Sequence, residues 1–104
     1  MNKQRRKRIE NVIRKIELVK TEINNSSEYL QNIKKELEDI LYEEENYFDN
    51  MPENLQGSMR GEAAEEAIDY LTEAIDSIDD ALNKTDLDDM NDSLDEAIDN
   101  LEYI

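Results

Sequence analysis

The feature that most constrains this chain is a heptad repeat that keeps its register from residue 9 to residue 47, with apolar residues at ten of its twelve positions. Its members, separated by alternating steps of three and four residues, are Ile9, Val12, Ile16, Val19, Ile23, Ser26, Leu30, Ile33, Leu37, Ile40, Glu44 and Tyr47. This spacing places them all along one face of an α-helix, and a heptad pattern of this length is typical of a coiled coil. We therefore expect one long helix over about residues 3–49. Its weakest point is Asn24-Asn25-Ser26-Ser27, a run of four poor helix formers.

A second apolar repeat follows a short connecting segment. Pro52 disfavours helical geometry in the residue before it, so residues 50–60 are expected to form a loop, with Ser58 as the N-cap of the next helix. The repeat then resumes through Ala64, Ile68, Leu71, Ile75, Ile78 and Leu82. Small residues that let a neighbouring helix approach closely recur beside it, at Ala67, Ala74 and Ala81. These signals predict a helix over about 61–83.

The register of this second repeat shifts between Leu82 and Leu87, which are five residues apart. Thr85 lies in the gap and is a typical N-cap, and the acidic residues after it suit the positive end of a new helix. We expect a last helix over about 86–103. Its buried residues are predicted to be Leu87, Leu94, Ile98 and Leu101.

The two repeats predict an all-α fold in one domain of 104 residues, an antiparallel coiled-coil hairpin with one long helix against two shorter consecutive ones. In the matching alignment, paired residue numbers sum to about 110, so that Ser26 lies opposite Thr85. Residues 1–20 carry a net charge of +6 and residues 21–104 carry −22. The hairpin would place the basic residues 5–8 near Asp99 and Glu102, and Arg14 and Lys15 near Asp95 and Glu96, with each exposed pair contributing about 0.2–1 kcal/mol.

The composition argues against several classes of function. The chain has no His and no Cys, which removes the usual general base and the thiolate ligands of zinc. The acidic run over residues 86–92 lacks the central Gly of a calcium loop and would place Ala97 at its twelfth position. We therefore expect no enzyme activity, no cofactor and no metal. Because no apolar run is long enough to span a membrane and no signal-peptide core follows the basic start, we expect a cytoplasmic protein.

Acidic residues are the remaining candidates for a functional site. The main predicted face comprises Glu62, Glu65, Glu66, Asp69, Glu73, Asp76, Asp79 and Asp80. Secondary faces are predicted at Glu43, Glu44, Glu45, Asp88, Asp89 and Asp92. Over 62–80 there is one carboxylate per ~3.5 Å of helix, close to the one phosphate per ~3.4 Å of a DNA strand. This density favours a protein that mimics the charge of nucleic acid and binds a basic, nucleic-acid-binding surface of another protein, without contacting nucleic acid itself.

The alternative is a structural or adaptor coiled coil whose acidic faces serve solubility alone. It would form a homodimer through Ile13, Leu41 and the alanine stripe, which consists of Ala67, Ala74 and Ala81. At the closed end of the hairpin, Tyr47 and Phe48 are expected to pack over the second repeat. The loop residues Met51, Leu55 and Met59 either tuck beneath the loop or form a small exposed contact patch.

One stretch of the chain carries a resemblance to a known group of proteins. It consists of Tyr47-Phe48-Asp49-Asn50-Met51-Pro52-Glu53-Asn54-Leu55-Gln56-Gly57-Ser58, then Arg60-Gly61-Glu62 and the Glu-Ala-Ile-Asp repeats at 66–69, 73–76 and 96–99. With these features the chain resembles small, acidic, helical proteins encoded in phages and prophages of Gram-positive bacteria. The resemblance implies an inhibitor of host defence, such as an anti-CRISPR or anti-restriction protein, that acts in the host cytoplasm. It transfers no functional residues.

Overall fold

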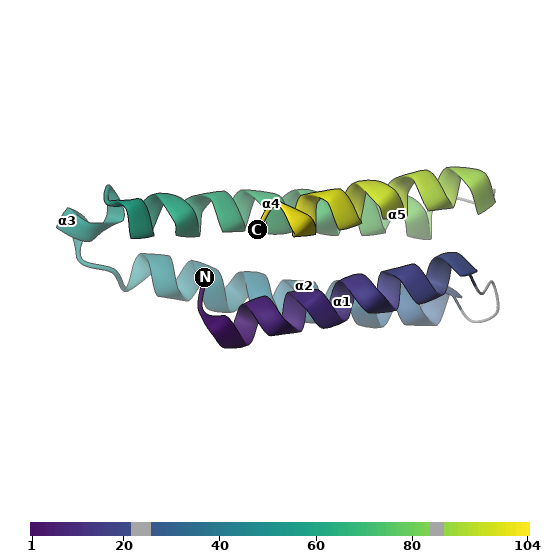
Figure 1. Ribbon diagram of the computed structural model, residues 1–104, viewed down its shortest axis with the longest axis horizontal. Coiled ribbons are helices and arrows are strands. Elements are labelled where there is room, and N and C mark those ends of the chain that lie inside the picture. Colours follow the sequence, from purple (N-terminus) through teal and green to yellow (C-terminus); the bar gives the residue numbers. More distant parts are fainter. Residues whose placement is uncertain (22–25, 84–86) are drawn as a thin grey trace.

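The computed structural model is all-α, and it describes residues 1–21, 26–83 and 87–104 (Figure 1). The surroundings of the side chains at 21, 26, 27 and 87–89 are also outside the description. The helices are α1 (Lys3–Thr21), α2 (Ser26–Asp49), α3 (Glu53–Gln56), α4 (Met59–Leu82) and α5 (Leu87–Glu102). No strand occurs in the described ranges.

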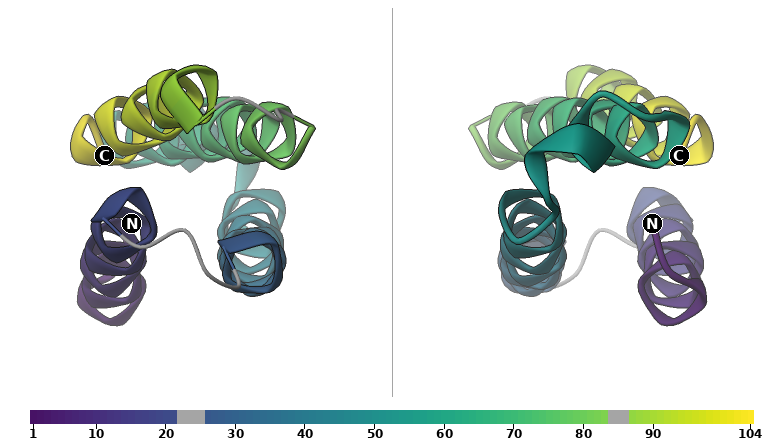
Figure 2. Two further views of the ribbon diagram at one scale, coloured as in Figure 1. Left: turned by 90° about the vertical axis from the view of Figure 1, so that its right-hand side faces the viewer. Right: turned by 90° about the vertical axis from the view of Figure 1, so that its left-hand side faces the viewer.

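The four long helices pack as an antiparallel bundle in two layers. One layer consists of α1 and α2 and the other of α4 and α5, with α1 facing α5 and α2 facing α4 (Figure 2). Successive long helices alternate in direction, which is the up-down-up-down topology of a four-helix bundle. The bundle measures 48 × 20 × 17 Å.

This arrangement corrects the prediction of a single helix over 3–49. α1 and α2 run in opposite directions side by side (Figure 1), and Arg8 of α1 contacts Glu36 and Glu43 of α2. α1 ends at Thr21 and α2 begins at Ser26. The predicted opposition of Ser26 and Thr85 lies outside the described residues.

Two contacts between the layers lie within a few residues of the expected antiparallel pairing. Lys34 of α2 pairs with Asp79 of α4, and Arg6 of α1 donates a hydrogen bond to the carbonyl oxygen of Ile104 after α5. The first segment nevertheless forms two helices rather than one, so the described helices make a bundle of two layers.

The core consists of the two apolar repeats. Its fully buried large residues include Val12, Ile16, Leu30, Ile33, Leu37, Ile40, Leu71, Ile78 and Leu94. Burying each such side chain contributes about 1.5–3 kcal/mol before entropy is counted. Ala67, Ala74 and Ala81 are also buried inside this one chain, and Ile13 and Leu41 pack half-buried against its core. The residues proposed for a homodimer contact are thus used within the protomer.

The connection between α2 and α4 is folded tightly. Ser58 caps α4 as expected, because its Oγ accepts a hydrogen bond from the backbone N–H of Gly61 at 3.4 Å. The predicted loop contains the short helix α3, and Gln56 at its end donates a side-chain hydrogen bond to the carbonyl oxygen of Met51 at 3.2 Å. Met51 is buried, as expected if it tucks beneath the loop. Leu55 and Met59 are exposed, as expected for a contact patch.

Gly61 permits the close contact between α3 and α4. A Cβ atom at this position would overlap the backbone of Gln56, whereas nothing lies within 4 Å of one at Gly57. We expect Gly61→Ala to lower the free energy of unfolding by about 1–3 kcal/mol, because the α3 backbone must move. Gly57→Ala is the matched control and should be neutral or stabilising by about 0.4–1 kcal/mol. Urea unfolding followed by circular dichroism measures both, and equal losses would contradict the contact.

Candidate functional site

The charge of this protein is divided unequally between the two layers of the bundle. In the first layer, α1 carries +6 and α2 carries −6, so the layer is neutral. In the second layer, α4 and α5 each carry −7, so the layer carries −14. Nearly all of the net charge of −16 therefore lies on the α4–α5 layer.

Two basic residues of α1, Arg5 and Arg8, pair with carboxylates of α2. Arg8 donates from Nε to Glu36 at 2.9 Å and from Nη1 to Glu43 at 2.6 Å. These hydrogen bonds, with that to Glu36 the stronger influence, raise the pKa of Arg8 above its ordinary value. Arg5 lies 3.9 Å from Glu43 and 3.5 Å from Glu44.

These contacts correct the predicted ion pairs. Residues 5–8 were expected to lie near Asp99 and Glu102. Arg6 does lie at the end of α5, where it donates a hydrogen bond to the carbonyl oxygen of Ile104 and lines a hollow together with Glu102. Arg5 and Arg8 instead pair with α2, because α1 lies alongside that helix. Asp95 pairs with Lys20 rather than with Arg14 or Lys15. Glu96, Asp99 and Glu102 are exposed on the α4–α5 layer. These three residues are absent from the predicted acidic face, because the hairpin alignment paired them with the basic residues near the start of the chain.

Glu44 is not a surface residue, which corrects its place in the predicted secondary faces. Its side chain is 0% exposed, and its carboxylate lies 3.5 Å from Arg5 Nε and 3.9 Å from the amino group of Met1. The Arg5 guanidinium also lies over the ring of Tyr47, 5.6 Å from its centroid. The signal was present in the sequence, since Glu44 occupies a seam position of the heptad repeat.

The main predicted face of α4 is exposed almost completely. Six of its members recur at alternating steps of four and three and form one line along the helix: Glu62, Glu66, Asp69, Glu73, Asp76 and Asp80. All six are exposed, as is Glu65 beside them, and the buried residues of α4 lie on the opposite side. This line, which we call the acidic stripe, extends about 27 Å along the helix.

Asp79 is the exception on α4, because it is half-buried and pairs with Lys34 of α2 at 2.7 Å. The hydrogen bond to Asp79 raises the pKa of Lys34 above its ordinary value of 10.5. A raised lysine pKa means that this pair favours the folded state below that ordinary value and loses its effect only as the pH rises through the raised pKa. At neutral pH the pair between α2 and α4 is therefore intact.

The other secondary positions have mixed surroundings. Glu45 and Asp92 are exposed, and Glu43 is half-buried against Arg5 and Arg8. Asp88 and Asp89 belong to α5, but their side chains lie outside the described residues.

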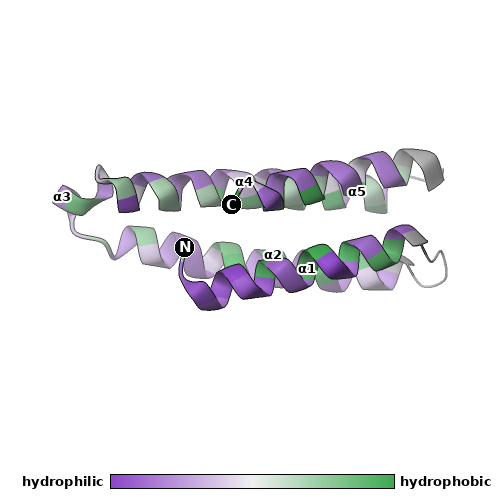
Figure 3. Cartoon of the chain, viewed as in Figure 1, coloured by the Kyte–Doolittle hydropathy of each residue, from purple (hydrophilic) through white to green (hydrophobic). Residues whose placement is uncertain are grey.

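Hydrophilic and hydrophobic segments alternate along each long helix, as expected for helices with one buried side (Figure 3).

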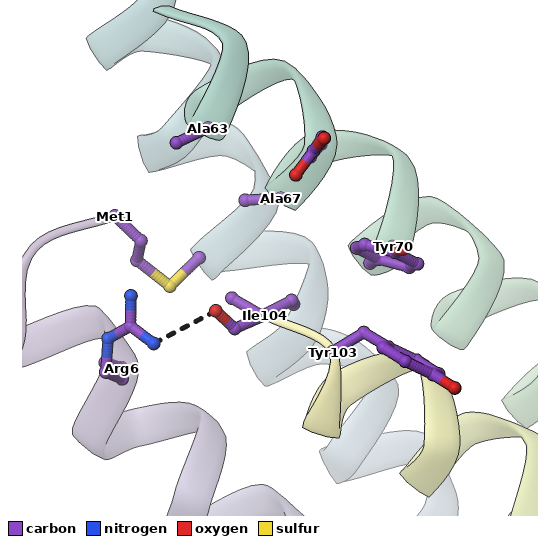
Figure 4. A pocket seen from close by; sticks show the side chains of 8 residues that line it. Met1, Arg6, Ala63, Ala67, Tyr70, Tyr103 and Ile104 are labelled. Carbon is purple, nitrogen blue, oxygen red and sulfur yellow. Dashed lines mark hydrogen bonds between the residues drawn. The ribbon is translucent and has the colours of Figure 1, made fainter. Parts of the chain in front are cut away.

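A small hollow lies where α5 ends beside α4. Its volume is about 70 Å³, and its walls include Ala63, Ala67, Tyr70 and Tyr103, with Arg6 and Ile104 at its other side (Figure 4). The rings of Tyr70 and Tyr103 stack with centroids 5.6 Å apart and planes 18° from parallel.

The described part of the chain contains no group of three acidic, His or Cys side chains arranged to hold a metal ion. None of its helices is long and apolar enough to cross a membrane. No protein family, no curated protein and no solved structure matches this chain. The case for function therefore depends on the charge and shape of the described surface.

Proposed function

We propose that this protein binds another protein, and that its α4–α5 face occupies a basic surface on which that partner would otherwise hold nucleic acid. The observation that carries the proposal is the charge of −14 on one layer, with the six carboxylates of the acidic stripe all exposed. A surface needed only for solubility would be served by charges of both signs, whereas a single sign costs stability through self-repulsion.

The seven exposed carboxylates of α4, which leave out the paired Asp79, lie at one per ~4 Å of helix, close to the one phosphate per ~3.4 Å of a DNA strand. A partner's Lys and Arg side chains, arranged for phosphates, would meet carboxylates at similar intervals. Opposite fields accelerate the encounter, and screening by salt weakens it. The sequence resemblance to phage proteins makes a host defence protein that binds nucleic acid our proposed class of partner, with inhibition by occlusion as the outcome.

The alternative, an oligomerising scaffold, has less support, because most of the contact surface proposed for it is used inside the protomer. Its alanine stripe is buried in the protomer, and Ile13 and Leu41 pack against the protomer's own core. The nucleic-acid mimic needs no such surface, since its acidic stripe is exposed in the single chain.

The test compares two variants with the same change in charge. The stripe variant replaces Glu62, Glu66, Asp69 and Glu73 with Lys. The control replaces four exposed acidic residues of α2 with Lys: Glu28, Glu38, Asp39 and Glu45. Partners are captured from a bacterial lysate on the wild-type protein and eluted with a salt gradient. For a captured nucleic-acid-binding protein, we expect the stripe variant to lose at least about tenfold in association rate and the control to lose much less.

Both variants should keep the helical circular dichroism of the wild type, because every substituted side chain is exposed. The wild-type protein should also compete with a DNA duplex for the partner. The proposal is wrong if the two variants lose binding equally, or if the affinity stays constant between low and high salt.

A further inference from the structure

The helix α4 extends well beyond the helix that lies beside it. It has 24 residues, whereas α5 has 16 and ends beside the middle of α4 (Figure 1). The stacked rings of Tyr70 and Tyr103 mark the place where α5 stops. The first three turns of α4 therefore have no described helix on the side where α5 packs farther along.

The side of α4 that faces α5 is a line of small residues. Its members recur at alternating steps of four and three: Ala63, Ala67, Tyr70, Ala74, Ser77 and Ala81. Beside α5 the small residues of this line are buried, Ala74 and Ala81 completely. Beyond the end of α5, Ala63 is exposed, and so is Met59 one turn earlier, at 87%. A surface suited to a closely packed helix thus continues past the end of α5.

The surroundings of this surface indicate what would cover it. The hollow of about 70 Å³ lies on it, between Ala63, Ala67 and the tyrosine pair (Figure 4). Glu66 of the acidic stripe lines the same hollow, as does Arg6 of α1, and Glu62 is exposed one turn before Glu66. Residues 59–70 carry four acidic side chains and Arg60, a net charge of −3. A second copy of this chain would bring like charges together at this rim, whereas a basic segment would be attracted to it.

We propose that residues 59–70 of α4, with Tyr103, form a docking groove for a basic amphipathic helix of the partner protein. This inference rests on the proposed function for the basic character of that partner. The docked helix would continue the line of α5 along about 17 Å of α4, which is three turns. Its apolar residues, spaced by three and four, would contact Met59 and Ala63, and its end would meet the ring of Tyr103. Its lysines and arginines would face Glu62 and Glu66.

The probes are two synthetic peptides of about 18 residues, or five turns, with the same leucine and lysine composition. One has its leucines at helical spacing and the other has them scrambled. We expect the wild-type protein to bind the amphipathic peptide about tenfold more tightly than the scrambled one, because only the first can place leucines in the groove. In Met59→Gln/Ala63→Gln the preference should fall to about twofold or less. Both substitutions are at exposed helical positions and keep the net charge.

The matched control is Tyr29→Gln/Tyr42→Gln, which removes two exposed apolar side chains from α2. It should keep the tenfold preference. The stripe variant should weaken the binding of both peptides by the same factor, because both carry the same number of lysines. The loss common to both peptides tests the proposed function, and the preference between them tests the docking groove. If the stripe variant weakens the binding of both peptides but Met59→Gln/Ala63→Gln keeps the preference for the amphipathic peptide, the docking groove is wrong and the proposed function stands. If the stripe variant weakens neither, the proposed function fails.

Amide chemical shifts locate the bound peptide. With the amphipathic peptide, we expect the largest changes at Ala63, Ala67 and Tyr103. Changes confined to α1 and α2 would overturn the docking groove. So would a concentration-dependent dimer, seen by sedimentation, that Met59→Gln/Ala63→Gln abolishes, because it would show that a second copy covers this surface.

Discussion

Replacing Arg5 with Met is expected to lower the free energy of unfolding by about 3 kcal/mol, because it leaves a carboxylate buried without its nearest cation. Glu44 is completely buried, and Arg5 Nε at 3.5 Å is closer to it than the amino group of Met1 at 3.9 Å. Neither oxygen of Glu44 has a hydrogen-bond partner within the described part of the chain. The carboxylate therefore depends on charge alone. Urea unfolding at neutral pH measures the loss.

The double variant Arg5→Met/Glu44→Leu should recover most of that loss or exceed the wild type. Glu44 follows Ile40 and precedes Tyr47 in the seam, a position where Leu packs well. Replacing a buried ion pair with apolar side chains is often neutral or stabilising by about 1–4 kcal/mol. The two substitutions are therefore strongly coupled, and a double-mutant cycle isolates the coupling.

Arg8→Met is the matched control, since its partners are much more exposed. The side chains of Glu36 and Glu43 are 34% and 42% exposed, so this loss should be only about 0.2–1 kcal/mol. Equal losses for Arg5→Met and Arg8→Met would contradict the buried pair. A double variant less stable than Arg5→Met would do so as well.

The buried pair also favours one register of α1 against α2. A polar residue at a single seam position specifies register in coiled coils, because other registers leave it without a partner. Shifting α1 by one heptad would move Arg5 and the amino group of Met1 about 10 Å from Glu44. The pair thus joins the ends of two helices whose other seam residues, apart from Ser26 and Tyr47, are all Ile, Leu or Val.

Local sequence signals identified α4, α5 and most of the core. The expected limits of the second and third helices lie within two residues of the limits of α4 and α5. These limits depend on neighbouring residues alone, namely the N-cap Ser58 and the register shift after Leu82. The buried seam residues follow from periodicity, since one apolar face must be covered in any packing. The exposure of the acidic stripe follows from the same periodicity, because the stripe lies opposite the seam.

The return of the chain between α1 and α2 could not be obtained in this way. The heptad register continues through residues 22–25, so a straight helix and a folded one bury the same seam. What distinguishes them is the extra burial beside the seam, as at Ile13 and Leu41, which depends on all four helices at once. The ion pairs of α1 were mispredicted for the same reason, since Arg8 pairs with whichever helix lies beside it.

Spin labels at positions 8 and 36 should lie about 10–20 Å apart, since neighbouring helices pack with axes about 8–10 Å apart. Arg8 Nε and Glu36 Oε1 are 2.9 Å apart in the bundle. In a straight helix over 3–49, the 28 intervening steps would separate these positions by about 42 Å. Pulsed electron paramagnetic resonance distinguishes these distances. Labelling needs only the two introduced cysteines, because the chain has none of its own.

A second pair of labels at Lys35 and Glu45 serves as the control. Both residues are exposed on α2, and their separation of about 15 Å is the same in either arrangement. A distance near 42 Å for positions 8 and 36, with the control unchanged, would show that the chain adopts the extended hairpin in solution. A short distance supports the bundle only if the sample sediments as a monomer. In a dimer, two extended hairpins side by side could also bring α1 of one copy next to α2 of the other. The measurement therefore combines the label distance with the oligomeric state, and the bundle requires both a short distance and a monomer.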